Sequence, residues 1–243
     1  MAMTLDTLIQ DNNERLAGLQ AGIGYTFNNV GLLQQAMVHS SFAFERMKKG
    51  RHNETLEFLG DAVLDLTVGY ILFTRFPDMR EGKLTRIRAG LVNESGLAEM
   101  ARSIGLGDYL LLGRGEDASG GREKSSILSC AYEALVGALF MDGGYDQALS
   151  FVRQWFEPLI DKRREILLAA DAKSALQEQL QEKFNEGPEY ILDKEDGPAH
   201  ARVFTVSVLF HGRALGCGRA SSKKEAEQIA ATAALHNLSE PPQ

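Results

Sequence analysis

The feature of this sequence that most constrains its fold is a set of four carboxylates inside an apolar segment, HNETLEFLGDAVLDL, residues 52–66. At about 100° per residue, a helix places these acids within an arc of roughly 80°. They are Glu54, Glu57, Asp61 and Asp65. An apolar set falls on a second, nearly opposite arc, which predicts a helix with an anionic face and a core face. That set is Leu56, Leu59, Val63 and Leu66.

The anionic face is costly for an isolated helix. Neighbouring like charges at i,i+3 and i,i+4 together lose about 1 kcal/mol. No Lys or Arg between Arg51 and Arg75 relieves this repulsion. Two interpretations fit the spacing: an ordinary solvated face, or a site for a hard divalent cation that takes oxygen ligands. The spacing alone does not decide between them.

The composition, 44% hydrophobic and 24% charged residues, is that of a globular protein. Its length of 243 residues is enough for one large domain or two smaller ones. Acids in the first twenty residues argue against a signal peptide, and charges interrupt the apolar helical stretches, so no membrane span is expected. Two cysteines are too few for a disulfide scaffold, and five histidines without HxH or HExxH spacing argue against zinc. We expect a protein of the reducing cytoplasm.

The chain is predicted to have two parts. Its first part is mostly helical, with apolar residues at a 3.6-residue period in four segments, 56–74, 83–104, 126–141 and 145–167. Residues 113–126, GRGEDASGGREKSS, have no apolar period and predict a glycine-rich, charged loop.

The pattern changes after a short polar joint at about residues 168–173. A helix, three strands of alternating pattern and an alanine-rich helix follow. We therefore predict a mostly α domain, residues 1–168, and a small α+β domain of order α-β-β-β-α, residues 169–243.

The net charge of −7 argues weakly against a nucleic-acid partner, but its distribution argues the other way. No Asp or Glu occurs between Asp196 and Glu225, where seven basic or titratable residues lie, Arg202, Arg213, Arg219, Lys223, Lys224, His200 and His211. Such a strip is compatible with phosphate binding, although a chance gap in the acids gives the same pattern.

Lys223 and Lys224 follow a predicted N-cap, Ser221 or Ser222, and lie in the first turn of the last helix. Lysines there oppose the helix dipole, unless they and the free N–H groups meet a phosphate. The segments SALQEQLQEKF, GPAH (197–200) and GCGRASSKKEAEQIAATAAL resemble the double-stranded RNA-binding domain over residues 171–238.

That resemblance implies contacts to an RNA duplex. The first helix and the strand–strand loop would enter two successive minor grooves, and the lysines would bridge the phosphates between them, so that the domain reads A-form shape. The implied RNA-binding residues are Gln177, Glu178, Gln181, His200, Ser222, Lys223 and Lys224. For the two glutamines, an ordinary polar helix face is the alternative.

Five segments of the first part, which together span nearly all of residues 20–160, resemble the ribonuclease III family. They are NETLEFLGDAVLDL, AMVHSSF (36–42), EGKLTRIRAGLVNE (81–94), YLLLGRGEDASGGREKSSIL (109–128) and YEALVGALFMDGGYDQA (132–148). With the duplex-RNA domain they give the bacterial two-domain arrangement of this family.

The resemblance implies a Mg²⁺-dependent endoribonuclease that cuts both strands of duplex RNA and leaves 5′-phosphate and 3′-hydroxyl ends. Two Mg²⁺ ions about 3.5–4 Å apart can activate the water and stabilise the leaving oxygen. The implied metal ligands are Glu57, Asp61 and Glu133, with Glu54 and Glu81 as accessory catalytic acids. Asp65 is then solvated surface. An acid at Glu81 also has a purely structural explanation, since the dipole favours it in a first helical turn.

One position departs from the family. The second ligand helix normally carries Asp three residues before its Glu, whereas this chain reads SCAYE and has Cys130 there. A thiol has a pKa near 8.5, and its thiolate suits softer metals than Mg²⁺. Three outcomes stay open: a weakened site, a site that prefers Mn²⁺, or a protein that binds duplex RNA and cuts poorly. Without the family, Cys130 would be interpreted as a core cysteine.

Two smaller features fit the same resemblance. Phe58 falls on the acidic side of the predicted helix, where a homodimer interface would explain it; a core Phe in irregular packing is the alternative. Arg114, Arg122 and Lys124 of the glycine-rich loop are candidates for phosphate contacts, although the loop lacks the GxxxxGK[ST] order of an NTP site.

The leading hypothesis is therefore a homodimeric endoribonuclease that acts on ribosomal RNA precursors and structured messengers. Its rival is a duplex-RNA-binding protein without cleavage, which Cys130 supports and the retained acids oppose. A helical protein that holds Mg²⁺ only structurally would leave the C-terminal domain unexplained.

Overall fold

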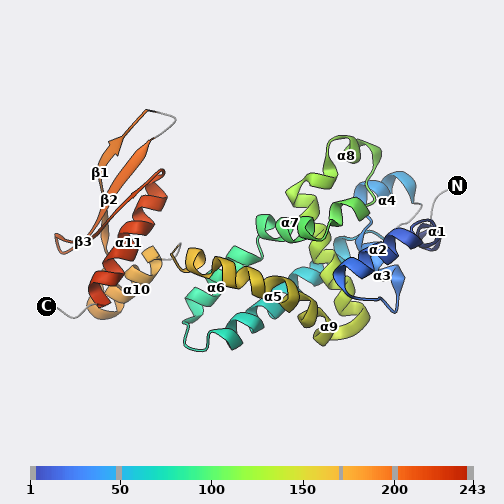
Figure 1. The fold of residues 1–243 in the computed structure, drawn as a ribbon, viewed down its shortest axis with the longest axis horizontal. Coiled ribbons are helices and arrows are strands. Elements are labelled where there is room, and N and C mark those ends of the chain that lie inside the picture. The colour runs from blue at the N-terminus through green and yellow to red at the C-terminus, as the bar shows by residue number, and fades with distance from the viewer. Residues whose placement is uncertain (1–3, 48–50, 170–171, 199–201, 240–243) are drawn as a thin grey trace. The chain divides into compact units, whose positions relative to one another are not determined.

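The computed structural model describes residues 4–47, 51–169, 172–198 and 202–239. The chain separates into two compact units, Met1–Asp161 and Lys162–Gln243, which are described one at a time. The first is helical, and the second combines a three-stranded antiparallel sheet with two helices (Figure 1). The predicted fold class is confirmed.

The first unit is built from α-helices joined by short turns. They are α1 (Leu5–Asp11), α2 (Asn13–Ile23), α3 (Val30–Ala36), α4 (Ser40–Arg46), α5 (Glu54–Arg75), α6 (Glu81–Leu91), α7 (Glu94–Ser103), α8 (Arg114–Ala118) and α9 (Ser125–Ala169), with 3₁₀ turns η1 (Leu106–Tyr109) and η2 (Gly121–Glu123). The single helix predicted over 83–104 is in fact α6 and α7. Asn93 separates them, because its side chain accepts the N–H of Gly96 and starts a new helix.

The long helix α9 contains one break. At Gly144 the backbone has φ 75° and ψ −170°, a conformation that glycine adopts without steric cost, so two helical segments meet at a kink there. The sequence predicted this break between residues 141 and 145. Over Ser125–Asp161, α9 is long and apolar enough to cross a membrane, but 61% of its most apolar window is buried inside the fold, as in a core helix.

The predicted glycine-rich loop, 113–126, is partly helical. It contains α8 and η2, and α9 already begins at Ser125. Arg122 and Lys124 bond within this segment and with its neighbours: Arg122 donates to the carbonyl of Leu110 at 2.8 Å, and Lys124 donates to Glu116 at 2.6 Å. One bond within the segment and one to Leu110 outside it therefore order this part of the chain.

Helix α5 has the two faces that its sequence predicts, with one correction. Leu56 and Val63 are buried, and Phe58 on the other side is 81% exposed. Leu66, predicted for the core, is 57% exposed. The buried face contains Gly60, against which α9 packs, and the fully buried Thr67, whereas Leu66 lies outside this face.

Helices α5 and α9 touch backbone to backbone. A Cβ atom placed on Gly60 would lie 1.8 Å from the carbonyl oxygen of Glu133, and one on Gly137 would lie 2.2 Å from the carbonyl oxygen of Leu56. No side chain larger than hydrogen fits at either position. The crossing therefore depends on two glycines, one on each helix.

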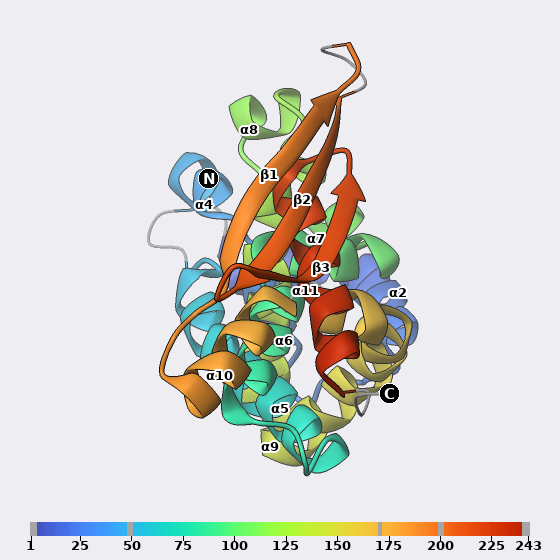
Figure 2. The same cartoon turned by 90° about the vertical axis from the view of Figure 1, so that its left-hand side faces the viewer.

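The second unit has the predicted α-β-β-β-α order. Its elements are α10 (Ala172–Phe184), β1 (Glu189–Asp196), β2 (Val203–Phe210), β3 (Arg213–Ala220) and α11 (Lys223–Ser239). Figure 2 shows β2 between β1 and β3, and both pairings are antiparallel. The helices supply Leu176, Leu180 and Ala230 to a core that also contains Val208 of β2.

Two glycines of β3 have a packing role. Gly216 and Gly218 lie within β3, where Cβ atoms would come within 2.4 Å of the Ala230 carbonyl oxygen and 2.1 Å of the Ala226 carbonyl oxygen. The alanine-rich face of α11 therefore lies directly on the backbone of β3.

We predict that Gly60→Ala destabilises the first unit by about 3 kcal/mol, because the added methyl group overpacks a rigid backbone contact. The measurement is urea unfolding followed by fluorescence of Trp155, the single tryptophan, which lies in α9. Gly69→Ala on the same helix is the matched control, since its Cβ would meet nothing closer than 3.7 Å. Equal stability of the two variants would contradict the backbone contact.

Candidate functional site

Helices α5 and α9 bring three predicted metal-site residues together. Glu57 comes from α5, while Cys130 and Glu133 come from one face of α9 at i,i+3 spacing. Their ligand atoms, two carboxylate oxygens and the Cys130 Sγ, lie within 4.8 Å of one another, and all three side chains are half-buried. The Gly60–Gly137 contact lies beside this cluster on both helices.

Negative charge is crowded in this cluster. Burial raises the pKa of the Glu133 carboxyl to about 7, and the charges of Asp61 and Glu57 act in the same direction. Asp61 is thus close enough to interact with Glu133, although its own side chain is exposed. A divalent cation would relieve this repulsion and would find carboxylate oxygens, the ligands that Mg²⁺ prefers.

Cys130 behaves differently from its neighbours. Burial raises the pKa of its thiol to about 12, and the hydrogen bond and charge of Glu57 add to the shift. At neutral pH the thiol therefore stays protonated and donates to the Glu57 carboxylate. The carboxylates fit a hard divalent cation, whereas the protonated sulfur of Cys130 offers it no suitable ligand.

The two predicted accessory acids and Asp65 occupy three different environments. Glu54 lies at the start of α5 beside His52, with 3.8 Å between its Oε2 and the histidine Nδ1. Glu81, at the start of α6, accepts a hydrogen bond from the hydroxyl of Thr85 at 2.8 Å and is not in the three-residue cluster. Asp65, predicted as solvated surface, is half-exposed and pairs with Arg88 at 3.4 Å.

A pocket of about 340 Å³ adjoins the cluster. It is lined by residues of α4, α5 and α9 and by the residues just before α4 and α5, namely His39, Ser40, Asn53, Glu54, Glu57, Ser126, Ile127 and Cys130. His39 and Ser126 are site residues that were not predicted from the sequence. The only sequence signal for His39 was its place in the AMVHSSF motif.

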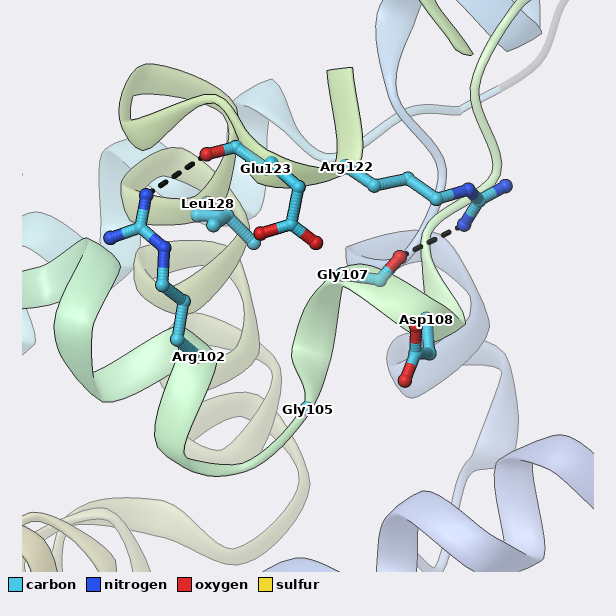
Figure 3. Close-up of a pocket in the computed structure, with 7 residues that line it drawn as sticks. All are labelled: Arg102, Gly105, Gly107, Asp108, Arg122, Glu123 and Leu128. Atoms are coloured by element: carbon cyan, nitrogen blue, oxygen red, sulfur yellow. Dashed lines mark hydrogen bonds between the residues drawn. The ribbon is translucent and has the colours of Figure 1, made fainter. Parts of the chain in front are cut away.

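A second pocket, of about 260 Å³, is structural (Figure 3). Its two arginines use their donors on backbone carbonyls: Arg102 donates to Glu123 at 2.9 Å, and Arg122 donates to Gly107 at 2.9 Å. Arg122 also pairs with Asp117. These bonds join η2 to α7 and to η1, so both arginines already have structural partners.

In the second unit, the predicted phosphate-binding residues are exposed at the start of α11. Ser222 caps this helix by accepting the N–H of Glu225 at 3.2 Å, and Lys223 and Lys224 follow in the first turn. This arrangement combines two cations with a helix N-terminus, which favours phosphate.

The predicted minor-groove residues lie on α10. Gln177 and Gln181 are exposed, and Gln181 donates to Asn185 at 2.9 Å, while Glu178 is half-buried. His200 lies outside the described residues.

Exposed apolar side chains gather along α5. Besides Phe58, they include Leu66, Tyr70 at 43% exposure and Phe73 at 68%. Scattered single apolar residues need no explanation, but a row on one helix is typical of an interaction surface.

Comparison with known proteins gives the same two-part division. A family described as Ribonuclease-III-like matches residues 29–159, and the double-stranded RNA binding motif matches residues 172–238. Ribonuclease 3 of Desulfotalea psychrophila is 58% identical over 238 residues, which cover 98% of this chain and 99% of that protein. Ribonuclease 3 of Geobacter metallireducens is 48% identical over 224 residues, 91% of each chain.

A solved structure is also similar. The nuclease domain of ribonuclease III from Campylobacter jejuni is 44% identical with a TM-score of 0.54, and the match covers 58% of this chain and 93% of that one. The identity to full-length relatives and the two matched families agree with the fold and with the acidic helix pair. The chain belongs to the ribonuclease III family of endoribonucleases, and it carries both the nuclease domain and the double-stranded RNA-binding domain.

Proposed function

We propose that this protein cleaves both strands of double-stranded RNA by Mg²⁺-dependent hydrolysis, leaving 5′-phosphate and 3′-hydroxyl ends. The observation that carries the proposal is the convergence of Glu57 and Glu133, with Asp61 beside them, at the crossing of α5 and α9. The duplex-RNA domain in the same chain supports the choice of substrate.

The residues of the chain have separate roles in this proposal. Glu57, Asp61 and Glu133 hold the metal, while Glu54 and Glu81 serve as accessory acids near the scissile phosphate. When bound, Mg²⁺ supplies positive charge for the reacting phosphate and lowers the pKa of water. Mn²⁺ is a suitable substitute because it too prefers carboxylate oxygens.

A second candidate function rests on Cys130. Because its protonated thiol donates to Glu57, it occupies one acceptor site on a carboxylate that the metal needs. A chain with this weakened site would bind duplex RNA without efficient cleavage. We favour the enzyme, since the carboxylates of Glu57 and Glu133 remain together in spite of Cys130.

The second unit would bind the duplex through two faces. Lys223, Lys224 and the cap Ser222 would meet phosphates, and Gln177, Glu178 and Gln181 of α10 would meet a minor groove. His200 would reach the next minor groove by the family pattern. This mode reads the shape of A-form RNA and its 2′-hydroxyls more than its sequence.

The protein would act as a homodimer through the exposed apolar row of α5, with Phe58 as its most exposed member. The row supports this assignment because large exposed apolar patches mark protein interfaces. A Campylobacter jejuni nuclease-domain structure, 44% identical, is described for structural flexibility in a region involved in dimer formation.

The cellular substrates would be stems in ribosomal RNA precursors and structured messengers in the cytoplasm. Both cysteines are free, and Cys217 is exposed. Free thiols of this kind fit a reducing compartment.

The decisive experiment is single-turnover cleavage of a long RNA duplex in Mg²⁺ and in Mn²⁺. We expect the unaltered protein to cut both strands, EDTA to abolish cutting, and Glu133→Gln to lower the rate by on the order of 100-fold. Cys130→Asp should raise the rate in Mg²⁺ by about 10-fold, since changes around metal ligands typically alter activity by 10- to 100-fold.

Asp65→Asn on the same helix is the matched control, and its rate should stay within about twofold of the unaltered protein, because Asp65 pairs with Arg88 at the surface. Binding without cleavage in either metal, with cutting restored only by Cys130→Asp, would favour the second candidate function. Neither binding nor cutting would contradict both.

RNA binding by the second unit gives a separate prediction. The double variant Lys223→Ala/Lys224→Ala should weaken duplex binding in EDTA similarly for all sequences and reduce the salt slope by about 2, one for each lost phosphate contact. Lys183→Ala, which removes one exposed charge near the end of α10, is the control and should leave the slope unchanged. Identical salt slopes for all three proteins would exclude this phosphate site.

The dimer predicts that Phe58→Ala raises the dissociation constant of the homodimer by about 10-fold or more, because a central aromatic at an interface contributes on the order of 2 kcal/mol. Sedimentation velocity over a dilution series measures it. Phe184→Ala removes an equally apolar, 53% exposed ring from the second unit and should have no effect. A monomer at all concentrations for the unaltered protein would refute the dimer.

A further inference from the structure

The pocket beside the acidic cluster contains one side chain that the proposed function leaves without a role. His39 caps α4 at the edge of this pocket, which it shares with Glu54 and Glu57. Its backbone is fixed from two sides: its own N–H donates to Leu111 at 3.1 Å, and the neighbouring Val38 carbonyl accepts the N–H of Asn53 at 2.9 Å.

Hydrogen bonds determine which nitrogen of His39 carries the proton. The backbone N–H of Ser41, which can only donate, lies 3.3 Å from the His39 Nδ1. The Ser41 hydroxyl oxygen lies 2.8 Å from the same Nδ1 and also accepts the N–H of Gly113 at 2.9 Å. Since Nδ1 accepts the Ser41 N–H, it carries no proton, and the hydroxyl is the donor of the second bond. Nδ1 is therefore an acceptor, and the proton of the neutral ring is on Nε2.

The ring is also held in its neutral form. Burial lowers the pKa of His39 below its ordinary value of 6.5, with His52 acting in the same direction, and outweighs the opposing charges of Glu116, Glu54 and Glu57. The edge of the ring with Nδ1 is occupied by Ser41. The Nε2–H edge is left for a group that enters the pocket.

We propose that His39 is a specificity-determining residue whose Nε2–H donates to a ribose 2′-hydroxyl of the substrate strand in this pocket. A 2′-hydroxyl both accepts and donates, and it distinguishes RNA from DNA. The pocket offers the matching pair, a donor on His39 and a carboxylate acceptor on Glu54.

The size of the pocket agrees with a single sugar. At about 340 Å³ it lies at the small end of the roughly 300–1,000 Å³ range of ligand pockets. Ser41 is then a positioning residue, since its N–H and hydroxyl fix the proton of His39 on Nε2. This proposal rests on the proposed cleavage of duplex RNA and adds how the nuclease domain recognises its substrate.

The test combines a protein change with a single-atom change in the RNA. His39→Asn is the main variant, because asparagine is a good N-cap that can still accept the Ser41 N–H but is too short to replace the Nε2 donor. Single-turnover cleavage is measured on an all-ribose duplex and on duplexes with one 2′-deoxy nucleotide at each position near the cut.

We expect one position at which the 2′-deoxy change slows the unaltered protein by about 10-fold, the upper range for one neutral hydrogen bond. His39→Asn should slow the all-ribose duplex equally and show no further loss with the deoxy nucleotide at that position. His39→Gln, whose amide can donate from nearly the same place, should recover part of the rate and of the deoxy effect. Trp155 fluorescence melts check that both variants fold.

Other outcomes overturn the proposal. If His39→Asn cuts as fast as the unaltered protein, His39 has no substrate contact. If the rate loss from His39→Asn and the rate loss from the 2′-deoxy nucleotide are independent, and so multiply, at every position, then His39 does not contact a 2′-hydroxyl. If the unaltered protein cuts the all-ribose duplex in neither Mg²⁺ nor Mn²⁺, the proposed function itself fails, and this inference falls with it.

Discussion

The close contact between α5 and α9 at Gly60 and Gly137 is the constraint on which the rest of the nuclease unit depends. Two helices usually pack 8–10 Å apart because side chains separate them. Here a Cβ on either glycine would collide with a backbone carbonyl. Since Glu57 and Glu133 lie within four residues of these glycines, the same approach that joins the helices brings the carboxylates of the site together.

This arrangement places several carboxylates close together in a half-buried cluster. Their mutual repulsion lowers the stability of the fold, but the same cluster can bind a cation. Glu133 shows the cost, because burial and its acidic neighbours favour its protonated form over the charged form. The part of this repulsion that comes from α5 can be recognised in the sequence, because its acids have no Lys or Arg close by. The part that comes from Glu133 on α9 can be recognised only from the structure, which shows where α5 and α9 cross. Strain of this kind is common where a site must bind a cation.

Local patterns predicted what local physics determines. The 3.6-residue period gave α5, the glycine gave the break in α9, and alternation with a capped helix gave the order of the second unit. One error arose where a tertiary contact decides: Leu66 is exposed, because α9 packs on the Gly60 side of α5. Spacing placed the acids of α5 on one face but left a solvated face and a cation site open, and Glu133 was implied by the family resemblance. The hydrogen bond that the Ser41 N–H donates to the His39 Nδ1 could not be predicted from any pattern in the sequence.

Cys130 can be understood from the same balance of charge. A carboxylate at its position would add another negative group against Glu57 and Glu133, in a cluster that already shifts the pKa of Glu133 upward. The thiol occupies that position without charge and instead donates a hydrogen bond to Glu57. Repulsion in the cation-free cluster is therefore smaller, and so is the attraction for a cation, since both scale with the number of anionic ligands. The residue at position 130, three before Glu133 on α9, thus determines the balance between the stability of the fold and the affinity of the site for a cation.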